Sequence, residues 1–298
     1  MSVSDRIPHV SIPELISVGA HFGHKTMRWN PQMKSYIYGE HNGVHILDLQ
    51  QTVPLFRSAL QKVYETVRGN GRVLFIGTKR QATEIIAEEA KRCGQYFVNH
   101  RWLGGMLTNW KTISLSIRTL QSYEEKLNNP RLNLSKKERL DLSRQYDKLQ
   151  RSLGGIRDMG GIPDLVFIVD TNKEHIAVKE AQALGIPVIA ILDSNSTPTG
   201  ITYPVPANDD ASKAIQFYCQ AVANAVIAGI EDGLSASGVD LGASEDVPGD
   251  MFDGESSDKD DKRSARKRPA KPAPNKGPAK KPVRAKKPTD SDNAASEE

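Results

Sequence analysis

The sequence predicts an α/β protein with a doubly wound parallel sheet, an inserted antiparallel coiled-coil hairpin and a disordered C-terminal tail. Three observations carry this prediction. Short apolar runs alternate with helical patterns, residues 106–154 show helical periodicity alone, and residues 231–298 are highly charged and poor in large apolar side chains. These boundaries give a sheet domain of residues 1–105 and 155–230, a helical insertion of residues 106–154 and a tail of residues 231–298.

Apolar runs of strand length recur through the sheet domain. RVLFIG (72–77), DLVFIVD (164–170) and PVIAIL (187–192) are the clearest, and VHILDL (44–49) and QYFVNH (95–100) are shorter candidates. Uninterrupted apolar strands are typical of a parallel sheet that is buried on both faces.

Helical periodicity follows these runs. Residues 82–90 and 176–184 carry apolar side chains at helical steps, and the alanine-rich segment 211–230 closes the domain as a helix. This alternation of strands and helices predicts βαβ units.

Two heptad seams predict the helical insertion. The first arm presents Trp110, Ile113, Ile117, Leu120 and Leu127, and the second presents Leu142, Tyr146, Leu149, Leu153 and Ile156. Asn128-Asn129-Pro130 breaks the first arm, and Ser135 with Glu138 forms a capping box that starts the second. Because glycine pairs flank the insertion and its apolar seam is narrow, we expect a projecting arm.

Charge is divided unevenly along the chain. Residues 1–230 hold 27 Lys and Arg against 21 Asp and Glu, whereas residues 231–298 hold 13 against 15. The tail joins an acidic block (231–261) to a basic, proline-rich block (262–288), a composition that predicts disorder. It serves either as a solubilising extension or as a non-specific arm that contacts phosphates.

The remaining composition predicts a cytoplasmic protein. The two cysteines, Cys93 and Cys219, are isolated and suggest neither a disulfide nor a metal motif. The N-terminal residues lack the apolar core of a signal peptide, and no apolar run is long enough to span a bilayer.

Two stretches without carboxylates, residues 15–39 and 90–123, combine cations with aromatic rings. Cations neutralise RNA phosphates, and flat rings stack on unpaired bases. The predicted RNA-contacting residues are Lys25, Arg28, Trp29, Asn30, Lys34, Lys79, Arg80, Arg101, Trp102, Asn109 and Lys111. The alternative is that the rings are core residues and the cations are merely solvated.

The segment NHRWLGGMLTNWKT (99–112) is the predicted neck of the hairpin. We expect its tryptophans to wedge the neck while Arg101 and Lys111 face RNA, where a carboxylate would repel phosphates. Its glycines allow close approach of backbone or phosphate.

An enzyme is the second hypothesis. Gly77-Thr78-Lys79 lies at a strand-to-helix turn where a phosphate could bind, but neither a P-loop nor a dinucleotide motif is present. Asp48, Asp170 and Asp193 end strands, where ligands bind in open α/β sheets. The simpler interpretation is capping, with Thr171 and Glu174 as a capping box.

A metal site is a further hypothesis. His24 would supply nitrogen, and Asp193, Asp209 and Asp210 would supply oxygen, to a structural zinc ion if the fold brings their loops together. No local spacing demands such a site, and no other cofactor is expected.

The sequence also resembles a known family. The resemblance is carried by five stretches, which include GAHFGHKTMRWNP and NHRWLGGMLTNWKT. They are residues 14–52, 73–82, 97–112, 153–170 and 186–198. They closely resemble the bacterial small-subunit ribosomal protein S-two family over roughly residues 8–228.

The resemblance implies a doubly wound, flavodoxin- or Rossmann-like domain with a coiled-coil insertion and no catalysis. It implies a structural component of the small ribosomal subunit, lying between head and body on the solvent side. The expected partners are small-subunit ribosomal RNA, ribosomal protein S-one and neighbouring subunit proteins, with no membrane and no homo-oligomer. A protein-docking module whose RNA contacts are incidental is the third hypothesis.

Overall fold

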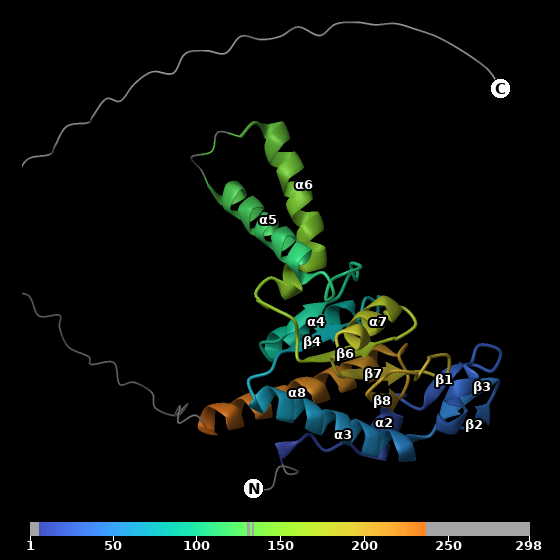
Figure 1. Ribbon diagram of the computed structural model, residues 1–298. Helices are drawn as coiled ribbons and strands as arrows, with labels where there is room; N and C mark the ends of the chain where they lie inside the picture. Colours follow the sequence, from blue (N-terminus) through green and yellow to red (C-terminus); the bar gives the residue numbers. More distant parts are fainter. Residues whose placement is uncertain (1–5, 130–131, 133, 237–298) are drawn as a thin grey trace, which may run out of the picture. The chain divides into compact units, whose positions relative to one another are not determined.

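A computed structural model of the chain describes residues 6–129, 132 and 134–236. Its centre is a five-stranded sheet in the order β5-β4-β6-β7-β8, with every neighbouring pair parallel (Figure 1). The strands are β4 (Val73–Ile76), β5 (Tyr96–Val98), β6 (Leu165–Val169), β7 (Val188–Leu192) and β8 (Tyr203–Pro206). The predicted α/β class with a parallel sheet is confirmed, and β8 is a strand that the sequence analysis missed.

Helices cover both faces of this sheet. One face packs against α3 (Leu49–Arg68), α4 (Thr83–Arg92) and α8 (Ser212–Ala236). The other packs against α7 (His175–Ala183) and the base of α5 (Trp110–Asn128). The segments 82–90, 176–184 and 211–230 are therefore helical as predicted, whereas α3 has no counterpart in the prediction.

The central strands divide their side chains between two cores. Val73 and Phe75 of β4 point into the core under α3 and α8, whereas Leu74 and Ile76 point into the core under α7 and α5. Every residue of β4, β6 and β7 is buried. Since consecutive strand residues face opposite sides, burial on both sides requires the uninterrupted apolar runs seen in the sequence.

A second, antiparallel sheet lies beside the carboxyl ends of the parallel strands. It contains β1 (Phe22–Lys25), β2 (Ile37–His41) and β3 (Val44–Leu47) in the order β1-β3-β2. Asn42 and Gly43 adopt φ angles of 52° and 74°, as expected for a tight hairpin between β2 and β3. The predicted strand at 44–49 thus belongs to this sheet.

Two short helices complete the N-terminal region. They are α2 (Ile12–Ser17) and the 3₁₀ helix η1 (Pro31–Tyr36). Asn30 caps η1 by accepting a hydrogen bond from the Gln32 N–H at 3.0 Å.

The insertion contains helices α5 and α6 (Lys136–Leu153), which pack against each other. The capping box is confirmed, since Ser135 Oγ accepts from the Glu138 N–H at 3.3 Å and Glu138 accepts from the Ser135 N–H at 2.9 Å. Ile113, Ile117 and Leu120 are buried, but Leu127 near the far end is only partly covered. The apolar seam thus weakens away from the sheet, and supercoiling of the two helices remains a prediction.

The base of this insertion covers the edge strand β5. The 3₁₀ helix η2 (Gly154–Ile156) follows α6 and contacts β5. A Cβ atom added to Gly155 would lie 2.1 Å from the Phe97 carbonyl oxygen, so only glycine allows this approach. At the opposite edge, β8 carries Pro204 and Pro206, which lack the N–H groups needed to pair with a further strand.

Helix α8 continues to Ala236, past residue 231 where the sequence analysis placed the start of the tail. Within this extra turn, Asp232 accepts a hydrogen bond from the Tyr64 hydroxyl and pairs with Arg6. The rest of the predicted disordered tail, residues 237–298, lies outside the described residues. Among the described helices, none combines the length and apolarity needed to cross a bilayer.

We predict that Gly155→Ala lowers the free energy of unfolding by about 1–3 kcal/mol, because the added methyl group forces η2 away from β5. Denaturant unfolding monitored by tryptophan fluorescence measures this change. Gly104→Ala is the matched control, since a Cβ atom there meets nothing within 4 Å. Equal stability of the two variants would contradict the close approach of η2.

Candidate nucleic-acid interface

The loops that follow the parallel strands gather at one edge of the sheet, which we call the carboxyl edge. The turn 77–80 follows β4, the neck 99–112 follows β5, and residues 193–197 follow β7. β5 and β7 are three strand positions apart, or about 14 Å at about 4.8 Å per strand.

The first carboxylate-poor stretch is anchored to this edge. The His24 N–H donates to Ser194 Oγ at 2.8 Å, and Asn30 Nδ2 donates to Thr197 Oγ1 at 3.0 Å. The fold therefore brings both predicted RNA-binding stretches to the carboxyl edge, although 50 residues (40–89) separate them in the sequence.

Most of the predicted cations are exposed there. The exposed ones are Lys25, Arg28, Lys34, Arg80, Arg101 and Lys111. Trp29 is 39% exposed, and the centre of its ring lies 5.5 Å from the centre of the His45 ring. Asn109 is exposed, whereas the Asn30 side chain is occupied by its contacts with Gln32 and Thr197.

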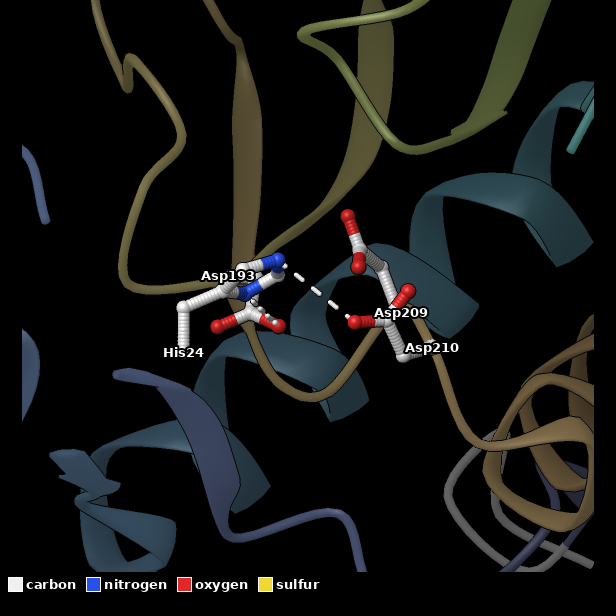
Figure 2. A group of neighbouring side chains, drawn as sticks. All are labelled: His24, Asp193, Asp209 and Asp210. Atoms are coloured by element: carbon white, nitrogen blue, oxygen red, sulfur yellow. Dashed lines mark ion pairs between the residues drawn. The ribbon is translucent and has the colours of Figure 1, made fainter. Parts of the chain in front are cut away.

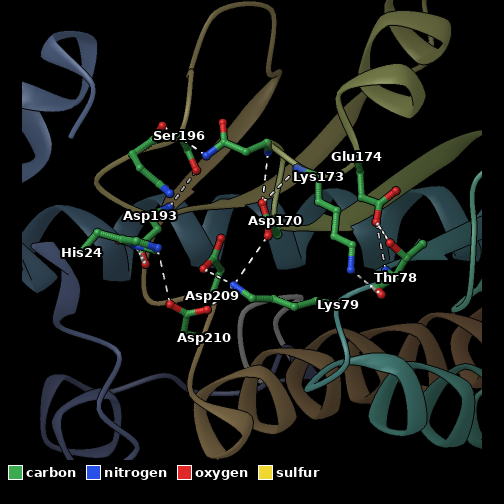
Figure 3. Close-up of polar contacts among 12 residues, drawn as sticks. His24, Thr78, Lys79, Asp170, Lys173, Glu174, Asp193, Ser196, Asp209 and Asp210 are labelled. Carbon is green, nitrogen blue, oxygen red and sulfur yellow. Dashed lines mark hydrogen bonds and ion pairs between the residues drawn. The ribbon is translucent and has the colours of Figure 1, made fainter. Parts of the chain in front are cut away.

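Lys79 is not available to a phosphate, which corrects its predicted role. Its ammonium group lies 2.8 Å from Asp209 Oδ1 and 3.5 Å from Asp170 Oδ2, and it also pairs with Asp210 (Figure 3). Burial opposes the charged form, but these three carboxylates outweigh it and raise the pKa of Lys79 above its usual range. Lys79 therefore neutralises acids within the protein.

Trp102 is also withdrawn from the surface. Its side chain belongs to the buried core, and its indole N–H donates to Glu180 Oε1 at 3.0 Å. Trp102 lies within the neck, and its ring is covered there, so the structure leaves no open face of this ring for a base.

Glu180, a buried carboxylate of α7, organises the neck and was missed by the sequence analysis. Besides the indole of Trp102, it accepts backbone N–H groups of Gly105 at 2.8 Å, Leu107 at 2.9 Å and Thr108 at 3.2 Å. The Thr108 hydroxyl lies at 3.2 Å as well. No spacing rule connects Glu180 with a loop so far away in the sequence.

These hydrogen bonds set the ionisation of Glu180. Burial alone would raise its pKa, but the donors from Trp102, Leu107, Thr108 and Gly105 outweigh burial and lower the pKa. The neck segment thus contains no carboxylate of its own, but it encloses the carboxylate of Glu180. The carboxylate it encloses is fully hydrogen-bonded and points inward.

The possible phosphate site at Gly77-Thr78-Lys79 is filled by the protein itself. The Thr78 N–H donates to Glu174 Oε1 at 3.0 Å, and the Thr78 hydroxyl lies 2.5 Å from the same oxygen. Glu174 therefore does not form the predicted capping box with Thr171, whose hydroxyl has no partner among the described residues. This geometry removes the main support for a nucleotide-binding enzyme.

The predicted metal-binding residues converge at the same edge (Figure 2). One possible ligand atom from each of His24, Asp193, Asp209 and Asp210 lies within 4.8 Å of the others. His24 Nδ1 lies 2.9 Å from Asp193 Oδ2, and His24 Nε2 lies 3.5 Å from Asp210 Oδ2. Histidine nitrogen and carboxylate oxygen are both ligands that zinc accepts.

Negative charge is concentrated in this cluster. Burial, followed by the neighbouring carboxylates of Asp193 and Asp170, raises the pKa of Asp209 to about 7 even though Lys79 opposes the shift. The hydrogen bond to Asp193 raises the pKa of His24. A cation would relieve the repulsion among these acids.

Comparison with known proteins extends these observations. The sequence model of the family described as ribosomal protein S2 matches residues 15–229. The small ribosomal subunit protein uS2 of Acidiphilium cryptum is 58% identical over 247 residues, which cover 83% of this chain and 96% of that protein. The uS2 protein of Agrobacterium fabrum is 60% identical over 242 residues (81% and 95%), and that of Zymomonas mobilis is 60% identical over 237 residues (80% and 95%).

We predict that Glu180→Gln lowers the free energy of unfolding by about 1–3 kcal/mol at pH 7, because a neutral amide accepts the neck donors less well. Since the folded pKa of Glu180 is lowered, the wild-type advantage is complete above about pH 4.3 and is lost as pH falls through the folded pKa. Denaturant titrations between pH 7 and pH 3 measure this advantage.

The matched control is Glu88→Gln, which neutralises an exposed carboxylate of α4. It should leave stability nearly unchanged. A Glu180→Gln penalty that persists undiminished at pH 3 would show that the charge of Glu180 is not what holds the neck.

Proposed function

The chain belongs to the ribosomal protein S2 family, and we propose that it is a constituent of the small ribosomal subunit that binds ribosomal RNA through its carboxyl edge. The family is structural and non-enzymatic. Its relatives are named small ribosomal subunit proteins, and the proposed location of this chain is the ribosome in the cytoplasm.

The observation that carries the proposed RNA binding is the separation of charges at the carboxyl edge. Lys25, Arg28, Lys34, Arg101 and Lys111 project into solvent. The acids of the same edge are instead held by internal partners, as Asp209 is by Lys79 and Glu180 is by the neck. Asp210 is exposed at this edge, but it pairs with Lys79 and His24. The exposed cations are therefore available to the phosphates of an RNA backbone.

A protein-docking role is proposed for the antiparallel sheet, with ribosomal protein S-one as the partner. Large apolar side chains are exposed in this sheet and in the loop that follows β1. Tyr38 of β2 is 77% exposed, Phe22 of β1 is also exposed, and Met27 of the loop is 94% exposed. Exposed apolar groups gathered in one region are typical of protein interaction sites.

A structural zinc ion is proposed for His24, Asp193, Asp209 and Asp210. These residues come from β1, from the loop after β7 and from the loop before α8. An ion held there would tie the antiparallel sheet to the parallel sheet, so its expected effect is on stability.

Reversing Arg28, Arg101 and Lys111 to Glu is predicted to abolish incorporation into small ribosomal subunits, because phosphates would meet acids in place of cations. Co-sedimentation of the variant with subunits measures incorporation, and each lost phosphate contact should lower the salt slope of RNA binding by about one. The control reverses Arg57, Lys62 and Arg68 on α3, remote from the carboxyl edge. Normal incorporation of the folded first variant would refute the proposed RNA face.

The zinc proposal predicts about one ion per chain after dialysis against zinc-free buffer, measured by elemental analysis. His24→Ala and Asp210→Asn should each lower that content and reduce thermal stability. His100→Ala, which removes an exposed histidine outside the cluster, should change neither quantity. If the wild-type chain retains no zinc, the zinc site is contradicted, whereas the proposal that the carboxyl edge binds RNA is unaffected.

A further inference from the structure

A groove of about 590 Å³ lies at the base of the helical insertion. The C-terminal half of α4, strand β5 and the last turn of α6 form its walls. Its volume falls in the range of sites that hold small ligands or single nucleotides, about 300–1,000 Å³. None of the residues predicted to bind RNA lines it.

The groove carries uncompensated positive charge. Lys91 of α4 and Arg151 of α6 line it, and both are exposed. Its only acidic lining residue among the described part of the chain, Asp158, is paired with Arg157 at 3.3 Å. Within that part, neither Lys91 nor Arg151 forms an ion pair with a carboxylate.

Two aromatic residues of β5 line the groove from opposite faces of the strand. Phe97 packs against the core under α3 and α8, and Tyr96 packs against the core under α7 and α5. Tyr96 and Phe97 of β5 line the groove and are half-buried, and the Lys91 ammonium lies 5.7 Å from the centre of the Phe97 ring. The Gln150 side chain adds a neutral donor and acceptor. Rings, cations and an amide around one concavity are the groups that hold unpaired nucleotides.

Strand addition is a poor explanation for the groove. A peptide that pairs with β5 would need the outer edge of that strand, but Gly155 approaches the Phe97 carbonyl oxygen so closely that even a methyl group has no room. The charge of the lining also favours a polyanion over an apolar peptide.

We propose that this groove binds a short unpaired segment of ribosomal RNA, with Lys91 and Arg151 on its phosphates and Tyr96 or Phe97 against a base. This proposal rests on the proposed function and adds a second RNA contact to the carboxyl edge. It assigns the base of the insertion to RNA recognition.

The test uses the full chain and a fluorescein-labelled single-stranded RNA of mixed sequence, about 12 nucleotides long. The groove variant is Lys91→Gln with Arg151→Gln, and the matched control is Arg57→Gln with Lys62→Gln on α3. A phosphate contact with a single strand contributes about 0.7 to the salt slope, so the groove variant should lower the slope by about 1.4. Affinity should fall about tenfold, whereas the control should keep the wild-type slope.

Cross-linking provides a second measurement that does not depend on charge. RNA containing 4-thiouridine, irradiated with the wild-type chain, should attach to a peptide that contains Tyr96 and Phe97. Cross-links confined to residues 25–34 would contradict RNA binding in the groove. Equal salt slopes for the groove variant and the control would contradict it as well.

The two proposals fail in different ways. If the wild-type chain does not enter small subunits, the proposed function fails. If it enters subunits but the groove variant binds RNA as the control does, only the groove proposal fails. Loss of a neighbouring protein from subunits that carry the groove variant, with RNA binding unchanged, would identify the groove as a protein site and overturn the proposal.

Discussion

Burial of the parallel sheet on both faces is the constraint on which the rest of the structure depends. Alternate side chains of β4, β6 and β7 enter two separate cores, so no polar residue is tolerated along these strands. Polar groups are therefore displaced to the strand ends. The carboxyl edge collects them because parallel strands all finish there.

The crowding of acids at that edge explains its internal pairings. Lys79 holds Asp170, Asp209 and Asp210, while Glu174 binds the Thr78 turn. Glu180 is satisfied by the neck in the same way. Carboxylates that would repel a polyanion are thus used as structural ligands, and the exposed charge at this edge is largely cationic.

The parts of the fold that depend on local periodicity were predictable from the sequence. The strands at 73–76, 165–169 and 188–192 are apolar throughout, and both predicted segments of the insertion are helices. Helix α3 was missed because Pro54 interrupts its helical pattern. The Asn42-Gly43 pair is typical of a hairpin turn, although no hairpin was predicted there.

The candidate site was harder to predict, because its chemistry is set by distant partners. Trp102 and Lys79 have the residue types expected of an RNA surface, yet Glu180 and Asp209 turn both inward. The convergence of His24 with three aspartates was anticipated only as a consequence of sheet topology. Exposure of a cation or a ring depends on tertiary neighbours that lie outside any sequence window.

The protection of both edges of the parallel sheet has a consequence for the newly made chain. Gly155 seats η2 against β5, and prolines occupy β8, so neither outer strand presents a continuous row of pairing groups. Edge-to-edge association is a common route to aggregation for proteins with open sheets. Newly made copies that await assembly are thereby protected against association through the edges of their parallel sheets.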